Sequence, residues 1–201
     1  MTERTGELTF KGEVPLTLIG PKLQPGDKAP DFTLTATDMS PASLADSAGK
    51  ARLISVVPSL DTSVCDAQTR RFSQEIGALG DKVVAYTISA DLPFAQARWC
   101  GAAGVDNVHC LSDHMALSFG DAYGTHIKEW RMDSRAVFVV DPEGAITYAE
   151  YVPEVAQEPD YPKALEALRA AAGAQGAPHG QPDGRDRGWF RALPYRRASP
   201  A

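Results

Sequence analysis

The apolar residues of this chain fall into short runs, and the runs at residues 51–57 (ARLISVV) and 82–90 (KVVAYTISA) predict two buried strands. Between the two runs, five positions follow one another at spacings of four, three, four and three residues, the period of one face of a helix. These positions are Cys65, Thr69, Phe72, Ile76 and Leu79. A strand, a helix and a strand in this order predict parallel pairing of the strands with a right-handed crossover.

Turn residues between short apolar segments predict two antiparallel hairpins elsewhere in the chain. The first pairs residues 8–10 with residues 15–19 across a turn at Lys11 and Gly12. The second pairs residues 135–140 with residues 145–152. The Asp-Pro-Glu-Gly segment between them has proline and glycine at the positions that a type I turn favours.

Two further segments have the pattern of helices. Asp91 and Pro93 suit the cap and the first turn of a helix that Gly101 or Gly104 ends. Residues 159–172 (PDYPKALEALRAAA) form a closing amphipathic helix. Together the elements predict an α/β fold, a mixed central sheet flanked by helices with an N-terminal β-hairpin. This is the outline of a thioredoxin-like fold.

Composition narrows the class of protein. The chain has 201 residues, 43% of them hydrophobic and 23% charged, which is typical of a globular protein with a full core. We expect one domain over residues 1–172 and a disordered tail over residues 173–201, which are rich in Gly, Pro and Arg and lack a repeating apolar face.

The net charge and the lengths of the apolar runs limit the kinds of partner and the location that we expect. The net charge of −6 disfavours general nucleic-acid binding. No apolar run approaches the roughly 18 residues of a membrane span. The N-terminus has no signal-peptide pattern, so we expect a cytoplasmic location in which the three cysteines are thiols.

One of these cysteines stands where its sulfur is expected to be reactive. The segment PSLDTSVC follows the first buried strand, and Asp61, Thr62 or Ser63 can cap the helix that begins there, which places Cys65 in the first turn. Unpaired backbone N–H groups and the positive end of the helix dipole favour a thiolate at that place. Thr62 can bring its hydroxyl beside the sulfur, and Pro58 offers no competing N–H. This pattern alone leaves a buried, inert cysteine as the alternative.

Pro58, Thr62 and Cys65 match the active-site motif of the peroxiredoxins. With the segments ISADLPFAQARWCG (88–101) and SRAVFVVDPEG (134–144), the sequence over about residues 7–171 resembles the bacterial thiol peroxidases, an atypical two-cysteine branch of that family. The resemblance implies a thioredoxin fold and a homodimer. It also implies that hydrogen peroxide and organic hydroperoxides are the substrates and that thioredoxin is the reductant.

The resemblance also assigns roles to single residues. Cys65 becomes the peroxidatic cysteine, Thr62 the group that hydrogen-bonds the thiolate and the peroxide, and Pro58 a shield against water. Arg135 matches the arginine that stabilises negative charge on the sulfur and on the departing oxygen. Cys100 matches the resolving cysteine, which condenses with the sulfenic acid of Cys65. A disulfide needs Cα atoms within about 7 Å. Because Cys65 and Cys100 are expected on separate helices, 35 positions apart, we expect the segments around both cysteines to rearrange during each cycle.

The other candidate residues give weaker indications of function. Cys110 has no role in the resemblance, and we expect it to be buried and inert in a short strand. His109 and His114 lack the paired spacing of structural zinc sites, so we expect neither a metal nor a cofactor. Met115 stands where the family often has an arginine, which leaves one positive charge fewer.

Three other functions are alternatives to the peroxidase. A disulfide oxidoreductase of the thioredoxin kind needs a second cysteine where this chain has Thr62. A peroxide-sensing relay protein could use Cys65 and Cys100 without efficient turnover, and turnover with thioredoxin separates it from the enzyme. A non-catalytic scaffold is disfavoured because the chain has all five residues to which the resemblance assigns a role. These are Pro58, Thr62, Cys65, Cys100 and Arg135.

Overall fold

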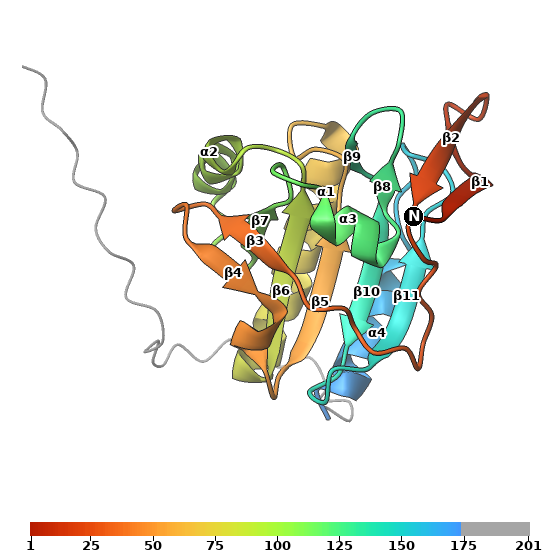
Figure 1. Ribbon diagram of the computed structural model, residues 1–201. Coiled ribbons are helices and arrows are strands. Elements are labelled where there is room, and N and C mark those ends of the chain that lie inside the picture. Colours follow the sequence, from red (N-terminus) through yellow and green to blue (C-terminus); the bar gives the residue numbers. More distant parts are fainter. Residues whose placement is uncertain (174–201) are drawn as a thin grey trace, which may run out of the picture.

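A computed structural model describes residues 1–173; residues 174–201, and with them nearly all of the predicted tail, lie outside the described part. The described residues form two sheets with helices packed around the larger one (Figure 1). The strands are β1 (Glu3–Phe10), β2 (Val14–Ile19), β3 (Thr33–Ala36), β4 (Pro41–Ser43), β5 (Ala51–Val56), β6 (Val83–Ser89), β7 (His109–Ser112), β8 (His126–Ile127), β9 (Met132–Asp133), β10 (Ala136–Val140) and β11 (Ile146–Tyr151). The helices are α1 (Ser63–Ile76), α2 (Pro93–Ala103), α3 (Ser118–Tyr123) and α4 (Tyr161–Ala171), with 3-10 turns η1 (Leu44–Ser47) and η2 (Gly77–Lys82).

The larger sheet is mixed, as the sequence predicts. Its order is β11-β10-β5-β6-β7-β3-β4, and the smaller sheet has the order β1-β2-β8-β9. β5 pairs in parallel with β6, and β6 in parallel with β7, whereas β10 runs antiparallel to β5. All six residues of β5 are buried, because a strand at the centre of such a sheet is covered on both faces.

Alternate residues of β5 and β10 serve two separate cores. One core contains Ile54 and Phe138 and is closed by side chains of α3, which lies in front of the sheet in Figure 1. The other contains Leu53 and Val139 and is closed by α1 and α4, which lie behind the sheet in the same view. Successive strand residues point to opposite faces, so the same two strands hold both layers of helices to the sheet.

The ends of α2 differ in part from the prediction. The residue at the N-cap is Leu92, so the prediction that Asp91 caps this helix is wrong. The Asp91 carboxylate instead accepts hydrogen bonds from Ser59 Oγ at 2.7 Å and from the Leu60 N–H at 2.8 Å. At the other end Gly104 is the C-cap with a φ of +65°, a conformation that glycine adopts without strain.

Both predicted hairpins are present. Lys11 and Gly12 turn the first hairpin with φ values of +55° and +68°, and β10 pairs with β11 in the second. The first hairpin also contacts the loop after β11, since Thr9 donates to the Pro153 carbonyl at 2.9 Å and accepts from the Val155 N–H at 3.0 Å. Among residues 1–173, no helix is long and apolar enough to cross a membrane.

Candidate active site

Cys65 lies at the carboxyl end of the central strands. β5 ends at Val56, Thr62 occupies the N-cap of α1, and Cys65 is the third residue of that helix. The antiparallel register pairs Ala136 at the start of β10 with Val56 at the end of β5. Arg135, which precedes β10, therefore reaches the same end of the sheet as Cys65, although 70 positions separate them in the sequence.

Arg135 holds the Cys65 sulfur from inside the protein. Its Nη2 donates to Cys65 Sγ at 3.4 Å, and both residues are buried. None of the ion pairs found in residues 1–173 involves Arg135. A buried cation without a carboxylate partner is costly unless another negative charge compensates it. The Cys65 sulfur is a contact of this guanidinium that could carry such a charge.

Two further acceptors fix the orientation of this guanidinium. Arg135 Nη1 donates to Gln68 Oε1 at 2.5 Å, and Nη2 also donates to the Val155 carbonyl at 3.1 Å. Gln68 is itself buried and donates through Nε2 to Ser55 Oγ of β5 at 2.7 Å. Because Val155 belongs to the loop held by Thr9, the N-terminal hairpin takes part in positioning the arginine.

The segment between β5 and α1 carries the other two motif residues. Pro58 is buried, and Thr62 is exposed at the N-cap of α1. The Thr62 hydroxyl donates to the Ser59 carbonyl at 3.0 Å, so in this structure it is engaged within its own loop. Asp91, in the loop that follows β6, supports that segment by accepting from Ser59 and Leu60. The role of Thr62 toward the thiolate and the peroxide stays a prediction.

The other two cysteines lie close to each other. Cys100 on α2 is half-buried, Cys110 on β7 is 4% exposed, and their sulfurs are 2.9 Å apart as free thiols. The hydrogen bond between the two sulfurs lowers the pKa of Cys100, and burial acts in the opposite direction. That hydrogen bond and burial together raise the pKa of Cys110.

All three cysteines border one apolar cluster. Cys100 packs against this cluster, which consists of Val57, Leu60, Cys65, Trp99 and Cys110. Trp99 is 8% exposed, and its Nε1 donates to Asp66 Oδ1 of α1 at 2.9 Å. The helices that carry Cys65 and Cys100 are therefore held together beside the peroxidase motif.

Residues 24–166 match the family model named Redoxin. The chain is 57% identical over 164 residues to the thiol peroxidase of Bacillus subtilis (strain 168), a match that covers 82% of this chain and 97% of that protein. The chain belongs to the thiol peroxidases of the redoxin family. The thiol peroxidase of Streptococcus sanguinis is also similar, at 51% identity over 162 residues, covering 81% of this chain and 98% of that protein.

Solved structures confirm the thioredoxin-like fold. A peroxiredoxin-like protein from Aquifex aeolicus superposes with a TM-score of 0.77 at 32% identity, covering 84% of this chain and 99% of its own. A thiol peroxidase from Chromobacterium violaceum has the same fold, with a TM-score of 0.75 at 21% identity, covering 84% of this chain and 98% of that one. The family predicted from Pro58, Thr62 and Cys65 is thus confirmed, and this thiol peroxidase is an enzyme of the peroxiredoxin type.

Some features of the site were missed from the sequence. Gln68 is three residues after Cys65 and so lies on the same helical face, but its polar side chain gave no reason to place it inside. The contact between Cys100 and Cys110 depends on how α2 packs on β7, which spacing does not encode. Met115 is 79% exposed and its sulfur accepts from Thr35 Oγ1 at 3.9 Å.

Proposed function

We propose that this enzyme reduces hydrogen peroxide and organic hydroperoxides with Cys65 as the peroxidatic cysteine. The observation that carries the proposal is the buried Arg135 guanidinium, which donates to the Cys65 sulfur at 3.4 Å and has no carboxylate partner within the described residues. A fixed cation beside a thiolate at a helix N-terminus is the environment that activates a cysteine as a nucleophile.

In the first step the Cys65 thiolate attacks the terminal peroxide oxygen. The S–O bond forms as the O–O bond breaks, and the alcohol or water leaves after it takes up a proton. Negative charge moves from sulfur to the departing oxygen, and the Arg135 guanidinium can stabilise the charge at both places. Thr62 would orient the peroxide once its hydroxyl turns from Ser59, and the buried Pro58 would limit the access of water.

In the second step Cys100 resolves the sulfenic acid of Cys65. Its sulfur attacks the Cys65 sulfur, a disulfide forms, and the oxygen leaves as water. The lowered pKa of Cys100 suits it to this attack. We propose that the first turn of α1 and the end of α2 rearrange in this step, because Trp99 ties α2 to Asp66 of α1 and Arg98 ties α2 to Asp61 in the loop before α1.

A dithiol reductant of the thioredoxin type would then reduce the disulfide. The reductant belongs to a compartment with a reduced thiol pool, so a cytoplasmic location is part of the proposal. A homodimer is also part of it, supported by large apolar side chains that are exposed in the single chain. These are Met1, Val14, Met39, Leu92, Phe94 and Met115. Sedimentation of the reduced protein as a monomer alone would remove the dimer.

The test of the cycle is peroxide consumption coupled to thioredoxin, thioredoxin reductase and a nicotinamide donor. We expect Cys65→Ser to abolish consumption and Cys100→Ser to stop after one equivalent of peroxide. If the wild type also stopped after one equivalent under these conditions, the protein would act as a peroxide-sensing relay instead. If Cys65→Ser kept the wild-type rate, Cys65 would not be the peroxidatic cysteine.

A further inference from the structure

Cys110 lies where a redox-active cysteine would lie, although the peroxidase cycle does not use it. Its sulfur is 2.9 Å from the Cys100 sulfur. A disulfide bond is about 2.05 Å long, so the two sulfurs need to approach by less than about 1 Å to form one. In the same folded structure, the polar contact of the Cys65 sulfur is with Arg135 and not with Cys100.

We propose that Cys110 is a third redox-active cysteine, which takes over the disulfide from Cys65 and leaves it as a Cys100–Cys110 bond. This inference rests on the proposed function, because the Cys65–Cys100 disulfide is its starting point. The Cys110 thiol gives its proton to solvent, and its sulfur attacks the Cys100 sulfur. The Cys65–Cys100 bond breaks, and Cys65 leaves as a thiolate. The oxidation passes from one pair to the other, so no external oxidant or reductant is consumed.

The folded structure favours the second disulfide. Bonding Cys100 to Cys65 disturbs the contacts of α2 with α1, including Trp99 with Asp66 at 2.9 Å. Bonding Cys100 to Cys110 lets α2 keep its place on β7, where the two sulfurs already touch. The leaving thiolate of Cys65 returns to the Arg135 guanidinium, which stabilises it. Both effects pull the exchange toward the Cys100–Cys110 bond.

The chemistry of the attacking thiol changes in the same direction. In the reduced enzyme the pKa of Cys110 is raised chiefly by its hydrogen bond to Cys100, then by burial and by the charges of Cys100 and Asp91. Once the Cys100 sulfur is part of a disulfide, it carries no charge and is only a weak acceptor for the Cys110 thiol. Two of the four causes then disappear, and the Cys110 thiol loses its proton more readily.

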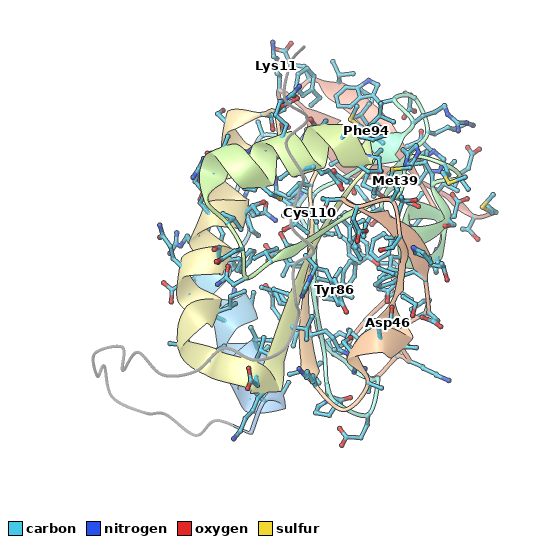
Figure 2. The ribbon with its side chains drawn as sticks, turned by 90° about the vertical axis from the view of Figure 1, so that its left-hand side faces the viewer. Lys11, Met39, Asp46, Tyr86, Phe94 and Cys110 are labelled. Atoms are coloured by element: carbon cyan, nitrogen blue, oxygen red, sulfur yellow. The ribbon has the colours of Figure 1, made fainter. Side chains whose placement is uncertain are left out.

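The new disulfide would face a different opening from the peroxide site. Cys100 and Cys110 both line a cavity of about 550 Å³ between α2, the sheet and the β3–β4 hairpin. Figure 2 looks onto α2, with Cys110 and Tyr86 on one side of this space and Asp46 on the other. Cys65 is not among the residues that line it. A small thiol in this cavity could reach the Cys100–Cys110 bond while Cys65 reacts again with peroxide.

The deciding experiment maps disulfides in the wild-type chain. The reduced protein, freed of reductant, receives one equivalent of hydrogen peroxide, is quenched with an alkylating agent at a series of times, and is digested without reduction for mass spectrometry. We expect the Cys65–Cys100 peptide pair to appear first and to give way to a Cys100–Cys110 pair in at least tenfold excess. A Cys65–Cys100 pair that persists unchanged, or a Cys65–Cys110 pair, would overturn the inference and leave the peroxidase cycle intact.

Stoichiometry gives a second, independent readout. Without reductant, the wild type should rapidly consume two equivalents of peroxide, because the exchange returns Cys65 to the thiolate. Cys110→Ser should consume one, and that one equivalent shows that its Cys65 site is folded. Cys65→Ser is the control for direct oxidation. A Cys100–Cys110 pair formed equally fast in this variant would show that no exchange is needed, whereas normal peroxide consumption by it would contradict the proposed function itself.

Discussion

Replacing Arg135 with methionine tests the electrostatic argument most directly. The guanidinium nitrogen lies 3.4 Å from the Cys65 sulfur. Two unit charges at this distance interact by about 5 kcal/mol at an effective dielectric constant of about 20. Part of this energy offsets the desolvation of both groups. We expect the second-order rate constant for the reaction with hydrogen peroxide to fall about 10²–10³-fold, the loss typical when a donor to developing negative charge is removed.

The assay is stopped-flow reaction of the reduced variant with hydrogen peroxide at neutral pH. The matched control is Arg52→Met. Arg52 is 4% exposed on β5 and donates to Ser47 Oγ at 3.1 Å and to the Asp141 carbonyl at 2.6 Å, away from the cysteines. We expect the control to lose stability but to keep the peroxide rate within a few-fold. If folded Arg135→Met lost less than tenfold, or if Arg52→Met lost as much, the charge on Arg135 would not be what activates Cys65.

Three further variants probe the support of the site and of the fold. Gln68→Met removes the amide that accepts from Arg135, and we expect a peroxide rate about tenfold lower, because one hydrogen bond to a charged group is worth about 1.5–3 kcal/mol; an unchanged rate would show that Val155 positions Arg135 alone. Asp91→Ala should lower the unfolding free energy in urea by about 1–3 kcal/mol, since it leaves Ser59 and Leu60 without their acceptor; no loss would mean that water replaces the carboxylate. Burial raises the pKa of Asp133 to about 8, with a further contribution from the charge of Asp113. The folded state therefore keeps a proton that the unfolded state releases near pH 4, and stability falls as the pH rises from about 4 to 8, by up to about 1.4 kcal/mol per unit. Asp133→Asn should flatten this fall in urea unfolding measured at pH 5 and pH 8, and an equal slope in both proteins would contradict the shift.

Local sequence patterns predicted the parts of this molecule that depend on local rules. The buried strands, both hairpins and the position of Cys65 in a first helical turn follow from apolar runs, turn residues and the helical period. The cap of α2 was wrong for a physical reason. An Asp two residues before a proline can cap a helix or support a neighbouring loop, and these choices look alike in sequence. Here Asp91 accepts hydrogen bonds from Ser59 and Leu60 in the neighbouring loop, and Leu92 occupies the N-cap position.

The contact between Cys100 and Cys110 shows why the rest could not be predicted in this way. Strand side chains alternate between faces, so Leu111 enters the core beside α3 while Cys110 faces the cluster that holds Cys65. Sequence alone assigns position 110 to the core, where an inert cysteine is common. Only the packing of α2 on β7 brings a second thiol within 2.9 Å of it. A buried cysteine is inert for lack of a partner, and this fold places beside Cys110 the cysteine that the proposed peroxidase cycle oxidises.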